Sequence, residues 1–216
     1  METNDEAIEA YDSLDGWKQE LSSTGAMLTA LDEAISKEDP IMVTAWSPHY
    51  MFPKWDIKYL EDPEGVYGEE ESVITIIREG LKDDLPEAYE IINRIELDLE
   101  DVEQRLLDAQ EMEFEDLAAD WVQNNQDIVA ECIAGVSQVN GHMIELVTTP
   151  WDDALFSSNV AKIVLEDQGY DVEVTPVDPA VLFEAVLSGS SDASLAPWIQ
   201  VLMESFIINM KGNLKI

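Results

Sequence analysis

The alternation of short apolar strands with amphipathic helices over residues 143–196 is the feature that most limits the folds open to this chain. In chain order the predicted elements are a strand over 143–147 (MIELV), a helix over 153–167, a strand over 171–177, a helix over 179–187 and a strand over 193–196. Gly169 marks the end of the first helix. The order strand, helix, strand, helix, strand predicts an α/β fold with a parallel sheet and right-handed crossovers.

The sequence before residue 135 predicts a second region that is rich in helices. The elements expected here are a helix over 2–12, a strand over 16–21 (GWKQEL), a helix over 23–36 capped by Ser22 or Ser23, a buried strand over 41–45 (IMVTA), a loop containing Pro48, Pro53 and Pro63, and three or four helices over 70–134. The division predicted is a helix-rich α/β lobe over 1–134, a connector over 135–142, the start of a second α/β lobe over 143–198 and an atypical tail over 199–216.

Three tryptophans lie within four residues after the ends of predicted strands. Trp46 follows IMVTA, Trp151 follows the strand that ends at Val147, and Trp198 follows the strand around Leu195. Ligands bind open parallel sheets beyond the carboxyl ends of the strands. Three indole rings there would suit a quaternary ammonium ion, which has no N–H to donate and is attracted to ring faces. Each tryptophan taken alone is more typical of packing, and Trp17, Trp55 and Trp121 are assigned to packing because they do not share this placement.

The charge of the chain excludes one class of partner. With 47 Asp and Glu against 11 Lys and Arg, the formal net charge is −36. Binding of nucleic-acid phosphate needs clustered cations, so a nucleic-acid partner is not expected. The 46% of apolar residues are enough to form a core. Because molar salt screens surface repulsion, we interpret the acidity as an adaptation to high salt.

The chain offers few groups for catalysis or metal binding. Cys132 is the only cysteine and is expected to be a buried, inert thiol, while His49 and His142 lack partners at ligand spacing. Phosphate-binding glycine motifs and a nucleophile-elbow motif are absent from the sequence. Asp152 and Asp153 are expected to cap the following helix. No metal, cofactor or catalytic residue is therefore predicted. The acidic N-terminus lacks the pattern of a signal peptide.

Two segments closely resemble one protein family. The segment IMVTAWSPHYMFPKWDIKYLEDPEGVYGE resembles the GWTPHWMF…KYLEDP signature of glycine betaine/proline betaine substrate-binding proteins of ABC transporters. The segment from PWDDALFSSNV to SGSSDASLAPW resembles that family's AWDS…TNV…GYDV…ASLSAW pattern. Two departures are Ala45 in place of the family's usual Gly and Tyr50 in place of its usual Trp.

The resemblance implies a type II periplasmic-binding-protein fold of two lobes, which closes on its ligand and presents it to a membrane permease. It also implies that Trp46, Trp151 and Trp198 form a box around the trimethylammonium group of glycine betaine. The family's contacts to the ligand carboxylate, a glycine-rich loop near the N-terminus and a His after the last box tryptophan, have no counterparts in this sequence. The implied location is the extracellular face of the cell membrane, as part of a transporter complex.

The resemblance ends at Trp198, before the predicted tail, and the sequence is expected to lack parts of the family at both ends. A single-base loss near the Ile199 codon would explain the tail, since the next reading frame permits a sequence like the family's. The predicted function is substrate binding for an ABC importer of glycine betaine or a related compatible solute, without enzymatic activity. The alternatives left open are a binding-incompetent fragment of such a protein and a halophilic cytosolic α/β enzyme.

Overall fold

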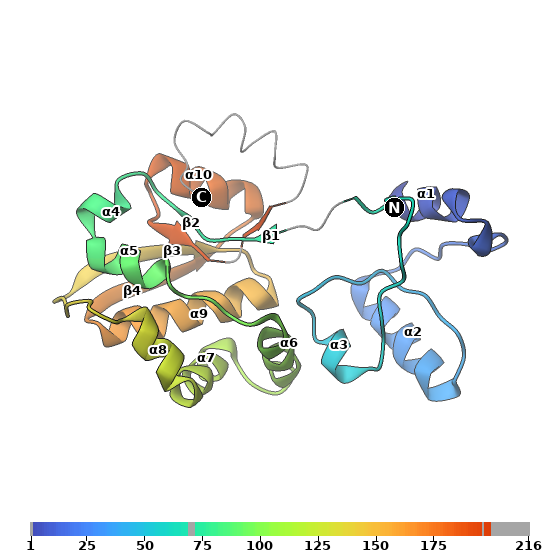
Figure 1. The fold of residues 1–216 in the computed structure, drawn as a ribbon, viewed down its shortest axis with the longest axis horizontal. Helices are drawn as coiled ribbons and strands as arrows, with labels where there is room; N and C mark the ends of the chain where they lie inside the picture. The colour runs from blue at the N-terminus through green and yellow to red at the C-terminus, as the bar shows by residue number, and fades with distance from the viewer. Residues whose placement is uncertain (1, 69–71, 196, 200–216) are drawn as a thin grey trace. The chain divides into compact units, whose positions relative to one another are not determined.

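The chain divides into two compact units in the computed structural model, and each is described by itself. The first consists of residues 1–47 and 51–70, and the second of residues 48–50 and 71–216. The residues described are 2–68, 72–195 and 197–199 (Figure 1). The connector predicted over 135–142 has neither helix nor strand before β3 and lies inside the second unit. The predicted lobe boundaries stay a prediction.

Short helices and extended segments make up the first unit. Its elements are α1 (Glu2–Ala10), the 3-10 helix η1 (Asp12–Leu14), α2 (Thr24–Lys37) and α3 (Met51–Lys54). The predicted cap of α2 is confirmed at Ser23, whose Oγ accepts a hydrogen bond from the Ala26 amide at 3.3 Å. The few buried apolar residues are Ala7, Leu28, Leu31, Met51 and Trp55.

The two strands predicted in this unit are wrong. Residues 16–21 and 41–45 form neither strand nor helix, and the described part of the first unit contains no strand. Residues 41–45 alternate between half-buried and exposed, as a strand would, but a strand also needs a neighbour with which to exchange backbone hydrogen bonds. In residues 16–21 the two apolar side chains, Trp17 and Leu21, are both exposed, so no buried face forms.

A four-stranded sheet forms the centre of the second unit, with strand order β2-β5-β3-β4. Its strands are β2 (Ile76–Ile77), β3 (His142–Thr148), β4 (Tyr170–Pro176) and β5 (Ala193–Ser194). β3 pairs in parallel with β4 along its whole length and with β5, which confirms the predicted parallel sheet. β2 adds an antiparallel edge next to β5. A separate antiparallel pair joins β1 (Ser72–Val73) to β6 (Trp198–Ile199).

Helices cover both faces of the sheet (Figure 1). Ile144 and Leu146 of β3 pack in the larger core with α9 (Asp152–Asp167). Val147 faces the other way and packs with α10 (Pro179–Ser188) in a smaller cluster. Successive side chains of a strand point to opposite faces, so β3 supplies both cores. Both helices confirm the elements predicted after residue 150.

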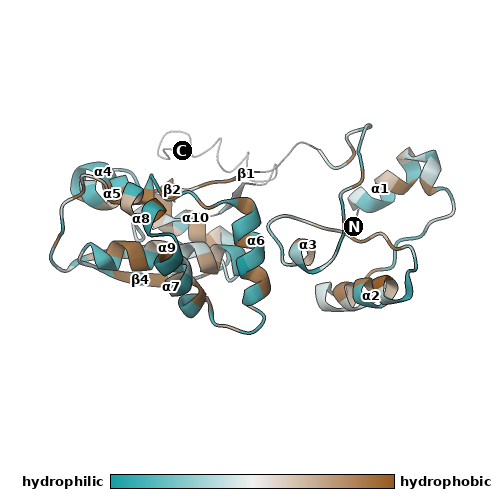
Figure 2. Ribbon diagram, turned by 60° about the horizontal axis from the view of Figure 1, so that its bottom comes forward, coloured by the Kyte–Doolittle hydropathy of each residue, from teal (hydrophilic) through white to brown (hydrophobic). Residues whose placement is uncertain are grey.

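The region from residue 70 to 134 contains more helices and strands than predicted. It begins with β1 and β2, because the run Val73 to Ile77 is β-branched, and continues with five helices. These are α4 (Leu81–Asp84), α5 (Pro86–Ile92), α6 (Leu99–Asp108), α7 (Phe114–Asn124) and α8 (Gln126–Cys132). α6 and α7 carry hydrophilic residues beside hydrophobic ones (Figure 2), and their apolar faces join the larger core.

Candidate ligand-binding site

Trp151 lies at the carboxyl end of β3, as predicted. It is the residue that precedes α9, with an extended backbone, and its carbonyl accepts a hydrogen bond from the Leu155 amide at 2.8 Å. Trp151 is 40% exposed, so packing does not enclose it. An exposed indole at a strand end and a helix N-terminus is placed where open α/β sheets bind ligands.

Asp152 and Asp153 do not cap α9, which corrects the prediction. Both belong to the first turn of the helix, and the N-cap position belongs to Trp151, whose side chain makes no capping hydrogen bond. The physical reason is one of register: a cap must precede the first helical residue, and the helix begins at Asp152. Carboxylates in the first turn still interact favourably with the positive end of the helix dipole.

His49 and Tyr50 form an aromatic pair that was not predicted. Their rings stack, with centroids 4.5 Å apart and planes 27° from parallel. Burial lowers the pKa of His49, while the charge of Asp152 acts in the opposite direction; burial and Asp152 both raise the pKa of Tyr50. Both rings therefore feel the carboxylate that follows Trp151. The adjacency of the two aromatic residues in SPHYMF was the only signal for this pair in the sequence.

Buried hydroxyl groups line the same edge of the sheet. Thr149 follows β3 and Ser194 ends β5, and these two strands are parallel, so both residues lie at carboxyl ends. Both are buried, and neither Thr149 Oγ1 nor Ser194 Oγ has a hydrogen-bond partner among the described residues. The edge that carries Trp151 is therefore polar beneath its surface.

The other two predicted site residues belong to different units of the chain. Trp198 belongs to β6 and pairs with Val73, and its side chain is not among those described. Trp46 belongs to the first unit, in an extended segment, and is half-buried. Trp151 and Trp198 thus lie in one unit and Trp46 in the other. The box formed by all three stays a prediction.

The packing prediction holds for two of the remaining tryptophans. Trp121 is buried and its Nε1 donates to Asp101 Oδ2; Trp55 is buried and its Nε1 donates to Asp32 Oδ1 at 3.0 Å. For Trp17 the prediction is wrong, because 45% of its surface is exposed.

Neither Cys132 nor a cluster of possible metal ligands adds a further site in the described part of the chain. Cys132 is buried, as predicted, and its Sγ donates to the Arg94 carbonyl at 3.3 Å. Among the residues that the structure describes, no three His, Cys, Asp or Glu side chains gather in a way that could hold a metal ion.

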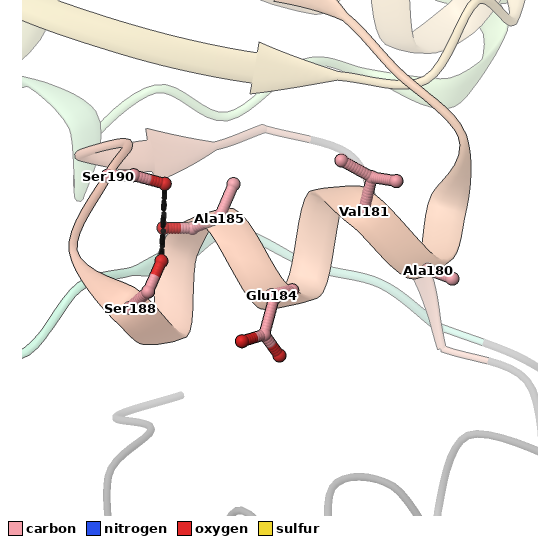
Figure 3. Close-up of a pocket in the computed structure, with 6 residues that line it drawn as sticks. All are labelled: Ala180, Val181, Glu184, Ala185, Ser188 and Ser190. Carbon is pink, nitrogen blue, oxygen red and sulfur yellow. Dashed lines mark hydrogen bonds between the residues drawn. The ribbon is translucent and has the colours of Figure 1, made fainter.

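A shallow hollow lies along α10, apart from the predicted site residues (Figure 3). The hydroxyl groups of Ser188 and Ser190 both donate to the Ala185 carbonyl, at 3.2 and 3.1 Å. None of the three predicted tryptophans lines this hollow, so we do not assign the ligand site to it.

Comparison with known proteins shows the family of this chain. Residues 1–124 and 142–215 match the family model described as the substrate-binding domain of the ABC-type glycine betaine transport system. The chain belongs to this family. It is 34% identical over 200 residues to the glycine betaine/carnitine transport binding protein GbuC of Listeria monocytogenes serotype 1/2a (strain 10403S), an alignment that covers 92% of this chain and 67% of GbuC.

A solved member of the glycine betaine family shares the fold. The crystal structure of lactococcal OpuAC, in a closed-liganded conformation complexed with glycine betaine, is 40% identical with a TM-score of 0.51. The match covers 62% of this chain and 53% of the lactococcal chain, so the matched part is about half of that relative. The predicted α/β fold of periplasmic-binding-protein type is confirmed.

The family match also reaches into the predicted tail. It runs to residue 215, which differs from the expectation that the resemblance ends at Trp198. Residues 200–216 lie outside the described part of the chain, and the proposed shift of reading frame stays a prediction.

Proposed function

We propose that this chain is the substrate-binding component of an ABC importer and that its ligand is glycine betaine or a related quaternary ammonium solute. Membership of the glycine betaine substrate-binding family carries the proposal. The names of the relatives support the ligand class, since one is a glycine betaine/carnitine binding protein and the other was solved with glycine betaine.

The chemistry of the ligand explains which residues we assign to it. A trimethylammonium group cannot donate a hydrogen bond, so ring faces bind it, each contributing about 0.5 to 2 kcal/mol when water is excluded. We assign this role to Trp46, Trp151 and Trp198. The exposed indole of Trp151 at the carboxyl end of β3 supports the assignment.

The proposed role is transport and not catalysis. The bound solute is delivered to the permease of the transporter at the extracellular face of the cell membrane. The described residues contain no helix of the length and hydropathy that a membrane span requires. The net charge of −36 supports operation in salt-rich surroundings, where a compatible solute is taken up for osmoprotection.

Calorimetric titration at molar KCl tests the proposal. Glycine betaine, carnitine and choline are compared with 3,3-dimethylbutanoate, which has the shape and carboxylate of glycine betaine but a neutral carbon in place of the ammonium nitrogen. We expect at least one quaternary ammonium compound to bind and the carbon analogue to bind at least about tenfold more weakly. A folded protein that binds none of the three quaternary ammonium compounds would contradict the proposal and favour the binding-incompetent alternative.

A further inference from the structure

The segment that leads into Trp46 lacks the backbone hydrogen bonds of a helix or a sheet. Residues 41–45 form neither element, and their backbone makes no hydrogen bond among the residues that the structure describes. A segment without such bonds has low local stability unless side chains hold it. Side-chain hydrogen bonds next to Trp46 therefore bear on how its half-buried indole is presented.

On the N-terminal side of Trp46, a hydrogen bond attaches the segment to α1. Thr44 Oγ1 accepts from Asn4 Nδ2 at 3.1 Å, and Asn4 belongs to α1. Tyr67 Oη in turn donates to Asn4 Oδ1 at 3.0 Å. An amide has its acceptor and its donor on opposite branches, so the bond from Tyr67 fixes which group Asn4 offers to Thr44.

The loop that carries Tyr67 is itself well fixed in the first unit. The carboxylate of Asp62 accepts from the Val66 and Tyr67 amides at 3.0 and 2.8 Å. It also accepts from the hydroxyl group of Tyr11, the residue that follows α1. The loop is therefore bonded to the end of α1 as well as to its first turn.

On the C-terminal side of Trp46, a second hydrogen bond attaches the segment to an aromatic pair. Ser47 Oγ and Tyr59 Oη are hydrogen-bonded at 3.1 Å. The ring of Tyr59 packs against Phe52 of α3, with centroids 5.1 Å apart. Trp46 thus lies between two hydroxyl side chains, those of Thr44 and Ser47, that are bonded to different parts of the first unit.

Both bonds suit a protein that operates in salt. They join neutral groups, so molar salt does not screen them as it screens ion pairs. Both are also exposed to solvent, and one such hydrogen bond contributes only modestly. Because they lie on the two sides of one residue, losing both should matter more than losing either.

We propose that Thr44 and Ser47 are positioning residues that hold the backbone on each side of Trp46 and so orient its indole for the ammonium group of the ligand. The inference rests on the proposed function, because Trp46 is an assigned ligand contact. Thr44 and Ser47 act through Trp46 and need not touch the ligand.

The first test measures glycine betaine affinity of the full chain at molar KCl by calorimetry. We expect Thr44→Val and Ser47→Ala to lower affinity by about threefold each and the double variant by about tenfold. Thr44→Ser, which keeps the acceptor, should stay within about twofold of the wild-type protein. Wild-type affinity in the double variant would overturn the inference.

Thr29→Val is the matched control. Thr29 is also an exposed threonine of the first unit, and its hydroxyl group donates to the Gly25 carbonyl at 2.8 Å within α2. Its replacement removes the same kind of group far from Trp46 in sequence, and affinity should stay unchanged. A loss as large as that of Thr44→Val would overturn the inference.

A double-mutant cycle separates positioning from a general effect on the fold. If Thr44 and Ser47 act through Trp46, their joint replacement should cost no further affinity in a Trp46→Ala background. A further loss of about tenfold there would show that the two hydroxyl groups act independently of the indole and would overturn the inference.

A ligand-free measurement keeps the inference distinct from the proposed function. In protein labelled with 5-fluorotryptophan, the ¹⁹F resonance of Trp46 is identified by its loss in Trp46→Phe. The double variant should shift or broaden this resonance and leave that of Trp55 in place, since Trp55 is buried in the same unit. An unchanged Trp46 resonance would overturn the inference.

Two outcomes need a defined reading. If the Trp55 resonance also moves, the double variant has lost its fold, and Tyr59→Phe replaces it, because this change removes one hydroxyl group and keeps the ring on Phe52. If no quaternary ammonium compound binds the wild-type protein, the proposed function fails, and the ¹⁹F spectra still decide whether the two bonds orient Trp46.

Discussion

The backbone of Gly169 lies directly against the carbonyl group of Val139: a Cβ atom on Gly169 would fall 2.3 Å from the Val139 oxygen. Gly169 has a φ of +93°, and the Val139 amide donates to the Gln168 carbonyl at 2.9 Å. The contact ties the connector that precedes β3 to the end of α9.

Replacing Gly169 by Ala should therefore be strongly destabilising. The new Cβ would meet backbone atoms, which cannot rotate away, in addition to the unfavourable positive φ. We expect a loss of about 3 kcal/mol in the free energy of unfolding. Urea unfolding at molar salt, followed by circular dichroism, measures it.

Gly135→Ala is the matched control for this change. Gly135 lies in the same connector with a φ of +74°, but its Cβ would meet no atom within 4 Å. We expect a loss of about 1 to 2 kcal/mol from the positive φ alone. Equal losses for the two variants would show that the contact with Val139 is unimportant.

Arg78 follows β2 and forms ion pairs with Asp84 at the end of α4 and with Asp192, the residue before β5. Its Nε donates to Asp192 Oδ1 and its NH1 group donates to Asp84 Oδ2, both at 2.7 Å. The second oxygen of Asp192 accepts from the Glu145 amide at 2.8 Å. The Arg78 and Asp192 side chains are only 16% and 14% exposed, so Arg78→Met would leave a largely buried carboxylate without its cation.

We expect Arg78→Met to lower the free energy of unfolding by about 2 to 3 kcal/mol, less than for a fully buried pair. Lys37→Met is the control, because the pair between Lys37 and Glu33 is more than half exposed. Its effect should stay below about 0.5 kcal/mol. Urea unfolding of both variants measures the difference, and similar values would contradict the importance of the Asp192 pair.

The tryptophan assignment predicts which rings matter for binding. Replacing Trp46, Trp151 or Trp198 by Ala should weaken glycine betaine binding by roughly tenfold or more in each case, because each removes a ring face and its packing. Trp17→Ala is the control, since Trp17 is also exposed but is not assigned to the site. Calorimetric titration measures the four constants, and a loss for Trp17→Ala as large as the others would refute the assignment.

The acidic surface predicts that stability rises with salt. At 1 M salt the Debye length is about 3 Å, which screens the mutual repulsion of a chain with net charge −36. The midpoint of thermal unfolding should therefore increase from dilute buffer to molar KCl. A variant with Gln at the exposed positions Glu111, Glu113 and Glu115 should show a smaller increase. A flat midpoint in the wild-type protein would mean that the acidity is no adaptation to salt.

Burial of Cys132 predicts a pH dependence of stability. Burial raises the pKa of the thiol in the folded state, so the unfolded chain loses this proton first as the pH rises. The stabilising contribution is complete below about pH 8.5, the ordinary thiol pKa, and is lost as the pH rises through the folded value. Cys132→Ala should remove this part of the alkaline decline in unfolding free energy. An identical decline in the variant would show that other groups cause it.

The sequence by itself determined the elements whose signals are local. The strands β3, β4 and β5 and the helices α9 and α10 were predicted, because each has its own apolar periodicity and α9 also has a terminator, Gly169. The placement of Trp151 at a strand end followed from the same reasoning. The family was also apparent from motif residues, and the comparisons confirm it.

The tertiary structure decided the features that depend on distant neighbours. Residues 41–45 have the alternation of a strand but remain outside any sheet, because pairing needs a partner that the local sequence does not contain. β2 joins β5 across more than a hundred residues, and Tyr50 packs against a core whose buried members begin only at Leu81. Such contacts depend on how the whole chain packs, so local periodicity carries no signal for them.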